Sequence, residues 1–342
     1  MNNQQTMKRW EISAPGRKNL SMRTLSIPQP QSGSVLVKVA AVALNSRDAH
    51  VVENGMGLPL EFPFVPTSDM SGTVVAVGTG VTRFKEGDRV ISTFVPDWID
   101  GPPRGNARAP SPTLGGPYQG VLAEFVTLSE AWLVQAPSSI DDDEASTLPC
   151  AGLTAWSALV ELGSVHSGQT VLIHGTGGVA LFGLQIAKAH GAEAIVISGS
   201  DDKLSRAKSI GADYCLRRNP GDWIEEVLRV TQDRGADHIL ETVGGANLNG
   251  SLAALAPGGR VSVIGVQAGF ELSAPAAQVL PKRAIIQGIT VGHRRALEDF
   301  VRAVDRASLK PVIDGRYKME QLPEALAHLD RGPFGKVIVT MD

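Results

Sequence analysis

One glycine-rich segment constrains the fold of this 342-residue chain more than any other feature. The residues Gly175-Thr-Gly-Gly-Val-Ala180 match the pattern G-x-G-x-x-[G/A]. They follow an apolar run typical of a buried strand, 171–174, and open a stretch with helical spacing of apolar residues, 179–190. In that setting Gly175 permits a tight turn, Gly177 lets the backbone approach a pyrophosphate, and the small Ala180 lets the helix pack on the strand. The segment therefore predicts a dinucleotide site at the start of a helix, rather than a glycine-rich turn without a ligand.

The surrounding pattern predicts the architecture of that domain. Short apolar runs typical of strands alternate with helical patterns at 171–174, 179–190, 194–197 and 203–210, and strand-like runs continue at 238–240 and 260–264. Strands that alternate with helices form parallel sheets with helices on both faces. We therefore expect an α/β fold with a doubly wound, Rossmann-type parallel sheet.

The two ends of the chain have a different texture. Between about residues 20 and 133, short apolar runs are separated by glycine and proline, which indicates a β-rich domain. The stretch 97–120 is rich in proline and glycine, and we expect a long surface loop that edges the active site. A chain of this length usually forms more than one core, and its last strand-like run, 336–340, is most economically explained as a return to the first domain. We expect one domain over 1–145 and 292–342, with the Rossmann domain inserted over 146–291.

Charge and cysteine content exclude several classes of protein. The formal net charge is −3 without a basic stripe, which argues against nucleic-acid binding. No apolar run is long enough to span a membrane, and the polar start, 1–20, lacks the core of a signal peptide. Cys150 and Cys215 are isolated, which argues against a disulfide framework and a cysteine-rich metal site. We expect a cytoplasmic protein that acts on a small molecule.

The end of the second Rossmann strand bears on the choice of cofactor. NAD-specific sites place an acidic residue there, but this strand ends in Ser198, followed by the small residues Gly199 and Ser200. Basic side chains that could pair with a 2′-phosphate follow: Lys203, Arg217 and Arg218. These features favour NADPH. The alternative is that the three basic side chains are solvated and bind no phosphate. NADH stays an alternative because Asp201 and Asp202 would repel a phosphate.

Several motifs together give the chain a family resemblance. They are 43–48 (ALNSRD), 66–72 (PTSDMSG), 77–90 (VGTGVTRFKEGDRV), 148–156 (LPCAGLTAW), the glycine segment, and 334–338 (FGKVI). The chain resembles the medium-chain dehydrogenase/reductase superfamily over nearly its whole length. It is most similar to the zinc-lacking, quinone oxidoreductase-like branch, whose members are often labelled zinc-type alcohol dehydrogenase-like. The resemblance implies a GroES-like catalytic domain built from both chain ends, an inserted Rossmann domain, an active site in the cleft, and a homodimer or homotetramer.

The resemblance also addresses metal binding. Zinc-dependent members bind catalytic zinc through Cys, His, and Cys or Asp at three motif positions, which are similar to Asn45, Ser68 and Cys150 here. An amide, a hydroxyl and one thiol make a poor zinc site. The four-cysteine structural lobe is absent as well. We therefore expect no zinc.

By the same resemblance, Thr154 should touch the nicotinamide, the backbone of residues 265–267 should bond its carboxamide, and Arg331 is similar in position to a cofactor-phosphate arginine. Thr154 could instead pack within a helix, and Arg331 could be a surface charge. The cofactor-binding residues expected from the motif and the resemblance are Thr154, Gly175, Thr176, Gly177, Gly178, Val179, Ser198, Ser200, Lys203, Arg218, Gly265, Val266, Gln267 and Arg331.

The residue types predict a class of reaction. Without a metal to act as a Lewis acid, the site favours acceptors that are already electrophilic. Hydride transfer to a quinone or an α,β-unsaturated carbonyl develops charge on an oxygen that hydrogen-bond donors can stabilise. Asn45 is the first candidate for that donor, and we expect Phe94 and Trp98 to be pocket walls or domain-interface packing. His50 is similar in position to the proton-relay histidine of zinc alcohol dehydrogenases, but Arg47 replaces the relay hydroxyl and a plain helix histidine is the alternative.

The leading hypothesis is therefore a zinc-independent, NADPH-dependent quinone or enone reductase. A metal-free alcohol dehydrogenase is the alternative, and it would need a general base near Asn45, for which His50 is the candidate. A third hypothesis is that the chain binds NADPH and has a structural or sensing role. Cys150 is expected to be a buried small side chain rather than a nucleophile.

Overall fold

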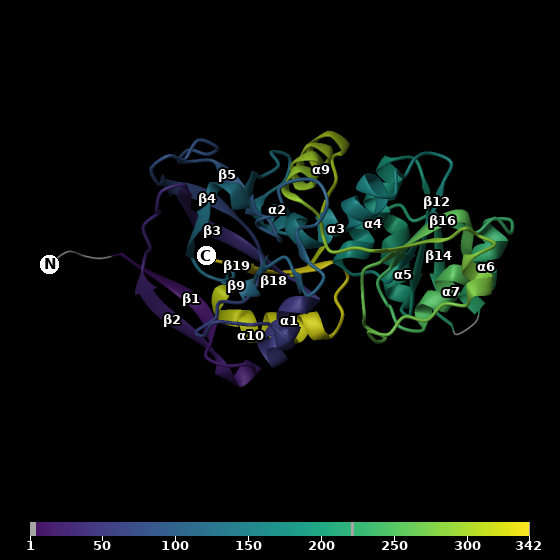
Figure 1. Ribbon diagram of the computed structural model, residues 1–342, viewed down its shortest axis with the longest axis horizontal. Helices are drawn as coiled ribbons and strands as arrows, with labels where there is room; N and C mark the ends of the chain where they lie inside the picture. The colour runs from purple at the N-terminus through teal and green to yellow at the C-terminus, as the bar shows by residue number, and fades with distance from the viewer. Residues whose placement is uncertain (1–4, 220–221, 342) are drawn as a thin grey trace. The chain divides into compact units, whose positions relative to one another are not determined.

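The chain forms two compact units in the computed structural model, which describes residues 5–219 and 222–341 (Figure 1). The first unit comprises Met1–Leu153 and Gly292–Asp342, and the second comprises Thr154–Val291. The first boundary thus follows residue 153, not residue 145. The reason is local packing, since the Cys150 N–H donates to Asp69 at 3.0 Å and Gly152 lies against the Phe300 ring within the first unit.

A mixed sheet is the centre of the first unit. Its strands are β11 (Leu133–Gln135), β5 (Arg89–Ser92), β4 (Asp69–Val77), β3 (Ser34–Leu44), β19 (Lys336–Thr340) and β18 (Ile313–Lys318), in that order, and β10 (Phe125–Ser129) also pairs with β3. Strand β19 comes from the end of the chain and lies antiparallel to β3 and parallel to β18. The late strand-like run therefore joins the first unit.

Shorter elements complete the first unit. They are the hairpin β1 (Thr6–Ile12) and β2 (Leu20–Ser26), the short strands β6 (Gly105–Asn106), β7 (Ala109–Pro110), β8 (Thr113–Leu114) and β9 (Pro117–Tyr118), and the helices α1 (Ser46–Asn54), α2 (Asp142–Ala145), α9 (Arg294–Ala307) and α10 (Leu322–Asp330). Short 3-10 turns lie at Arg17–Asn19, Gly55–Gly57, Glu130–Trp132 and Met319–Gln321, and a π-turn lies at Leu148–Gly152.

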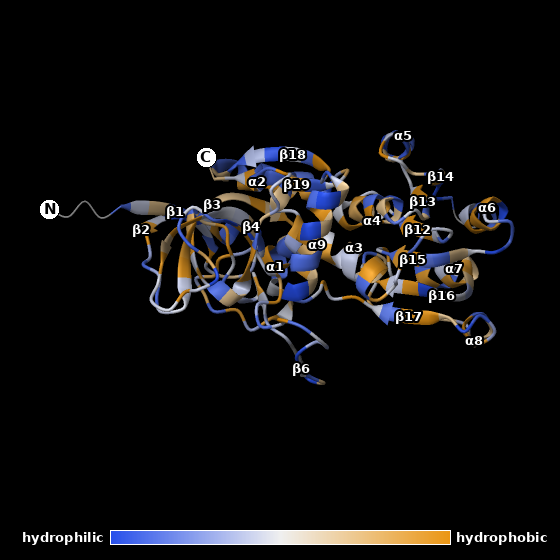
Figure 2. Ribbon diagram, turned by 90° about the horizontal axis from the view of Figure 1, so that it is seen from above, coloured by the Kyte–Doolittle hydropathy of each residue, from blue (hydrophilic) through white to orange (hydrophobic). Residues whose placement is uncertain are grey.

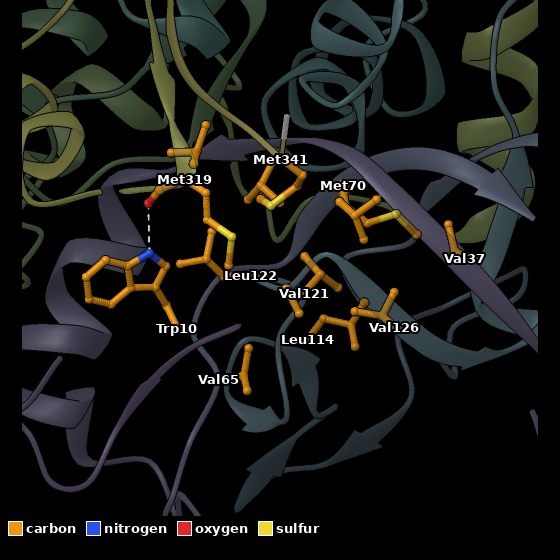
Figure 3. Close-up of a cluster of buried hydrophobic side chains, with 14 of the residues drawn as sticks. Trp10, Val37, Val65, Met70, Leu114, Val121, Leu122, Val126, Met319 and Met341 are labelled. Carbon is orange, nitrogen blue, oxygen red and sulfur yellow. Dashed lines mark hydrogen bonds between the residues drawn. The ribbon is translucent and has the colours of Figure 1, made fainter. Parts of the chain in front are cut away.

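The core of the first unit joins distant parts of the chain (Figure 3). Trp10 donates from its indole Nε1 to the carbonyl oxygen of Met319 at 2.8 Å. Leu114, which is fully buried, belongs to the same cluster. The expectation of a long surface loop over 97–120 is therefore wrong for its last part, because an isolated apolar residue among prolines and glycines carries no periodic signal.

The second unit contains a six-stranded parallel sheet. Its order is β14 (Tyr214–Arg217), β13 (Glu193–Ser198), β12 (Thr170–His174), β15 (Ala236–Glu241), β16 (Leu255–Val263) and β17 (Ile285–Gly288). Its helical segments are α3 (Leu153–Trp156, at the boundary), a π-turn at Ser157–Glu161, α4 (Gly178–Ala189), α5 (Asp201–Ser209), α6 (Asp222–Val230), α7 (Asn247–Ala253) and α8 (Ala276–Val279). This is the order expected of a doubly wound dinucleotide-binding sheet, which confirms the predicted fold class.

The two edge strands of this sheet were not expected from the sequence. The residues of β14 are half-buried or exposed, and those of β17 are mostly exposed. Edge strands pack on fewer neighbours than central strands, so their side chains show no continuous apolar run. Pairing with β13 and β16 defines them.

Candidate functional site

The glycine segment has the geometry of an anion-binding turn. Strand β12 ends at His174, and Gly175 follows with φ of +85°, a conformation that favours glycine. Helix α4 starts at Gly178 without a side-chain N-cap, so the N–H groups of its first turn are available to a ligand. A Cβ added at Gly177 would meet nothing within 4 Å, so the space in front of the turn is open. Gly175, Thr176, Gly177, Gly178 and Val179 therefore form one turn at the carboxyl end of the sheet.

Close packing of α4 on the sheet depends on small side chains. Ala180 is buried, as expected. A Cβ added at Gly183, one turn later, would lie 2.2 Å from Leu240 Cδ1. Gly183 therefore permits the close approach of the helix to β15, a role that the sequence motif does not assign.

A buried polar network lies at the carboxyl ends of β12 and β15, next to the turn. Glu241, at the end of β15, accepts hydrogen bonds from the N–H groups of Val243 (2.8 Å) and Gly244 (3.0 Å) and from the Ser251 hydroxyl (2.5 Å). His174 Nε2 lies 3.0 Å from the same hydroxyl. Burial lowers the pKa of His174 to about 4, so its ring is neutral at physiological pH. Burial acts to raise the pKa of Glu241, but the net shift is downward, and the hydrogen bonds from Ser251, Gly244 and Asn247 favour the ionised carboxylate.

The expected 2′-phosphate residues lie at the ends of β13 and β14. Ser198 pairs in register with Arg217, and the Arg218 N–H donates to the Ser198 carbonyl at 2.9 Å. The Ser200 hydroxyl accepts from the Lys203 N–H at 3.4 Å and so caps α5. Arg217 forms an ion pair with Asp201 at 2.8 Å, which offsets the negative charge that counted against a phosphate. Within the described part of the chain, the buried Nε of Arg218 has no hydrogen-bond partner.

The remaining expected cofactor residues fall in different places. Gly265, Val266 and Gln267 follow β16, and a Cβ at Gly265 would lie 1.8 Å from the Thr242 carbonyl oxygen, so only glycine fits there. Thr154 is buried in α3 at the start of the second unit. Arg331 is exposed after the last residue of α10, in the first unit.

The first unit contains a buried polar cluster around the start of α1. Its side chains are at most 9% exposed, and they belong to Asn45, Asp48, Ser68, Asp69 and Lys336. Lys336 donates from Nζ to Asn45 Oδ1 and to the Leu44 carbonyl oxygen, both at 2.6 Å. Asp69 accepts from the Ser68 hydroxyl at 2.5 Å and from the Cys150 N–H at 3.0 Å. We call these residues, with Cys150, the Asp69 cluster.

Comparison with known proteins identifies the family of the chain. The description "Alcohol dehydrogenase GroES-like domain" matches residues 31–138, and "Zinc-binding dehydrogenase" matches residues 178–307. A zinc-type alcohol dehydrogenase-like protein of Schizosaccharomyces pombe is 36% identical, with 97% of each chain covered. The chain belongs to the medium-chain dehydrogenase/reductase superfamily.

Other relatives of this superfamily agree in fold. Human quinone oxidoreductase is 26% identical, with 95% of each chain covered. A crystal structure of a putative alcohol dehydrogenase from Sinorhizobium meliloti is 58% identical, covers 98% of this chain and 99% of its own, and superposes with a TM-score of 0.96. The superfamily uses nicotinamide dinucleotides, and the chain is accordingly an NAD(P)H-dependent oxidoreductase that acts on small molecules.

The Asp69 cluster does not suit a catalytic zinc ion of the kind that some superfamily members bind. An ammonium group, not a metal, meets the Asn45 oxygen. Burial, reinforced by Asp69, raises the pKa of the Cys150 thiol, which is therefore protonated at neutral pH, whereas zinc binds the thiolate. Within 5–219 and 222–341, no group of three or more His, Cys, Asp or Glu side chains could hold a metal ion.

The other side chains considered in the sequence analysis lie outside the Asp69 cluster. His50 is exposed on α1. Arg47 donates to the Thr113 hydroxyl at 2.6 Å and to the Gly116 carbonyl at 2.7 Å. Its guanidinium carbon lies 5.1 Å from the centre of the buried Phe94 ring, so Arg47 and Phe94 hold the 113–116 segment. Trp98 packs edge-on against His293 at 5.6 Å, which is a packing role within the first unit.

Three residues of the Asp69 cluster escaped the sequence analysis. Asp48, Asp69 and Lys336 all lie within the motifs that carried the resemblance, but their chemistry depends on strands that are far apart in the chain. Burial, and then the charge of Asp69, raises the pKa of Asp48 to about 7. Burial also raises the pKa of Asp69, although Lys336 opposes the shift. Two carboxyl groups and one ammonium group therefore share a single buried site.

Proposed function

We propose that this oxidoreductase reduces quinones or α,β-unsaturated carbonyl compounds with NADPH and without zinc. The observation that carries the proposal is the Asp69 cluster. An amide, a hydroxyl and a thiol stand there at the positions that resemble the metal-ligand positions of zinc-dependent members, and the Lys336 ammonium group binds the amide oxygen. Such a site can stabilise an oxygen that gains negative charge through hydrogen bonding. Its donor set would not hold a Lewis acid with which to activate a simple alcohol.

The chain's own residues would divide the work between two sites. The turn over 175–179 would bind the pyrophosphate through backbone N–H groups, and Thr154 and residues 265–267 would position the nicotinamide, which supplies the hydride when bound. Asn45 would donate from its amide to the oxygen of the acceptor. Solvent would supply the proton that completes the reduction.

The preference for NADPH rests on the ends of β13 and β14. Ser198 takes the place of the acidic residue that would bind an NAD ribose. The buried Nε of Arg218 is without a partner among residues 5–219 and 222–341, and the negative charge of Asp201 is paired with Arg217. Arg218 and Lys203 would therefore face a 2′-phosphate.

The test is an initial-rate assay on chelator-treated protein, with zinc content measured by mass spectrometry. NADPH and NADH are compared against matched quinone, enone and simple aldehyde acceptors. We expect zinc-free protein to oxidise NADPH fastest with a quinone or an enone. Activity with aldehydes alone, restored by added zinc, would refute the proposal. Alcohol oxidation by zinc-free protein without enone reduction would support the metal-free dehydrogenase instead, and tight NADPH binding without turnover would support a sensing role.

We further propose that the protein forms a homodimer or homotetramer through β17. This strand is the last of the parallel sheet and is partly hydrophobic (Figure 2). Ile285 and Ile286 within it are 41% and 39% exposed. Leu280, just before it, is 73% exposed. An apolar edge strand is a template for pairing with a second copy about a twofold axis. Light scattering should show that Ile286→Lys yields monomers, while Val75→Lys, at an exposed residue of the other unit, does not; an unchanged mass for Ile286→Lys would refute this interface.

The proposed setting is the cytoplasm. Both cysteines are free thiols, which suits a reducing compartment. Among the helices of the described residues, none combines the length and apolar character needed to cross a membrane.

A further inference from the structure

Lys336 is an unusual residue to find buried in a sheet. It opens β19 and is 4% exposed, although lysine is almost never fully buried unless it is paired. Strand β19 lies beside β3 (Figure 1), and Val337 pairs in register with Leu44. The Lys336 side chain, one residue earlier, therefore reaches the end of β3. There Nζ donates at 2.6 Å both to the Leu44 carbonyl oxygen and to Asn45 Oδ1.

This contact determines which way the Asn45 amide faces. An ammonium group has three donors and no acceptor, so only the oxygen of the amide can be turned toward Lys336. The Nδ2 group of Asn45 must then face away from it. This nitrogen is buried, and no acceptor within the described ranges bonds to it. It lies near enough to Asp69 to favour the ionised carboxylate, without a hydrogen bond of normal geometry.

A buried donor without a well-formed hydrogen bond is costly and calls for an explanation, of which a catalytic role is one. An acceptor oxygen near Asn45 would satisfy this nitrogen. Lys336 also polarises the amide from the oxygen side, which strengthens donation from Nδ2. The positive charge of Lys336 and the Nδ2 donor of Asn45 are thus joined through a single amide group.

We propose that Lys336 is the positioning residue of the reductase site, which orients and polarises Asn45 toward the oxygen of a quinone or enone. This inference rests on the proposed function. When an enone is reduced, its β-carbon gains a hydride, the electron pair of the C=C bond shifts toward the carbonyl oxygen, and NADPH becomes NADP⁺. The enolate oxygen accepts the Asn45 N–H bond until the α-carbon takes a proton from water.

The test compares Lys336→Met, Asn45→Ala and the double variant with the wild type, in zinc-free protein. Steady-state kinetics with one enone give kcat and KM, fluorescence titration gives the NADPH dissociation constant, and circular dichroism reports the fold. We expect Lys336→Met to lower kcat by roughly 10- to 100-fold, less than or similar to the loss of an oxyanion donor. The NADPH dissociation constant should change by less than about twofold, because that site belongs to the other unit.

The double variant separates positioning from a merely structural role. If Lys336 acts through Asn45, then Lys336→Met should cost little additional kcat in the Asn45→Ala background. Equal losses in both backgrounds would overturn the proposal, and so would an unchanged kcat in folded Lys336→Met. Lys85→Met, at an exposed lysine, is the matched control and should keep wild-type kinetics.

Two further variants keep the proposal testable if Lys336→Met does not fold. Asn45→Asp retains the contact with Lys336 but has no amide donor, so kcat should fall in protein that circular dichroism shows to be folded. Lys336→Arg retains a donor toward Oδ1 and should recover part of the wild-type kcat; a folded Lys336→Arg no faster than Asn45→Ala would contradict the proposal. If the wild type itself binds NADPH but reduces neither quinone nor enone, the proposed function fails; an active wild type with an equally active Lys336→Met refutes only the role of Lys336.

Discussion

Replacing Asp48 by asparagine should change how the stability of the protein depends on pH. Asp48 is 1% exposed, one of its oxygens accepts from the Asn45 N–H at 2.8 Å, and the other has no partner in the part of the chain that the structure describes. Burial, reinforced by Asp69, raises the pKa of Asp48 from 3.8 to about 7. The ionised carboxylate is therefore poorly accommodated in the folded protein.

The sign and size of the effect follow from linkage. Because the folded pKa lies above the unfolded one, the folded state binds the extra proton, so Asp48 contributes stability at low pH that is lost as pH rises through 7. The folded pKa lies about two pH units above pH 5, and each unit is equivalent to about 1.4 kcal/mol. The free energy of unfolding should therefore fall by about 3 kcal/mol between pH 5 and pH 8.5. Asparagine cannot ionise and should not show this loss.

Thermal unfolding followed by circular dichroism at pH 5 and pH 8.5 measures the difference. For a domain of this size, about 3 kcal/mol corresponds to roughly 6–12 °C. The difference in midpoint between Asp48→Asn and the wild type should be roughly 6–12 °C more favourable to the variant at pH 8.5 than at pH 5. A constant cost of the new amide would cancel in this comparison. Asp233→Asn, at an exposed aspartate, serves as the control and should show no such change. A constant difference between Asp48→Asn and the wild type across pH would refute the reasoning.

Three further predictions concern the second unit. Gly177→Asp should fold normally, because a Cβ there meets open space, but should lose NADPH binding since a carboxylate would repel the pyrophosphate; unchanged affinity in a fluorescence titration would remove the turn from the site. Lys203→Ala combined with Arg218→Ala should weaken NADPH by roughly tenfold, the effect of about 1.4 kcal/mol, and NADH much less, and an equal loss for both would show that the 2′-phosphate lies elsewhere. His174 has a folded pKa of about 4, below its unfolded value of 6.5, so the wild type should lose stability as pH falls through that window. His174→Gln should lack this part of the acid sensitivity. If circular dichroism gave the same acid unfolding curve for His174→Gln and the wild type, the lowered pKa of His174 would be refuted.

Local chemistry in the sequence determined the class of the fold and the conformation of the glycine turn. A turn that needs positive φ accepts glycine, and the start of a helix on a buried strand needs small residues, so the spacing of Gly175, Gly177 and Ala180 is readable without coordinates. The alternation of apolar runs and helical patterns was sufficient for the parallel sheet, because each central strand is buried on both faces. The positions of Asn45, Ser68 and Cys150 likewise followed from the sequence through motif resemblance.

Tertiary structure alone decided what surrounds those positions. Lys336 reaches Asn45 because a strand from the end of the chain pairs with β3, and nothing in local sequence sets that pairing. Asp69 meets the Cys150 N–H only in the folded protein, and burial there is the largest cause of the raised pKa values of Asp48 and Asp69. His50 shows the converse, since its motif position suggested a role but its side chain lies on the exposed face of α1. Short-range preferences are written residue by residue, whereas the energies of buried charges depend on partners that lie hundreds of residues away along the chain.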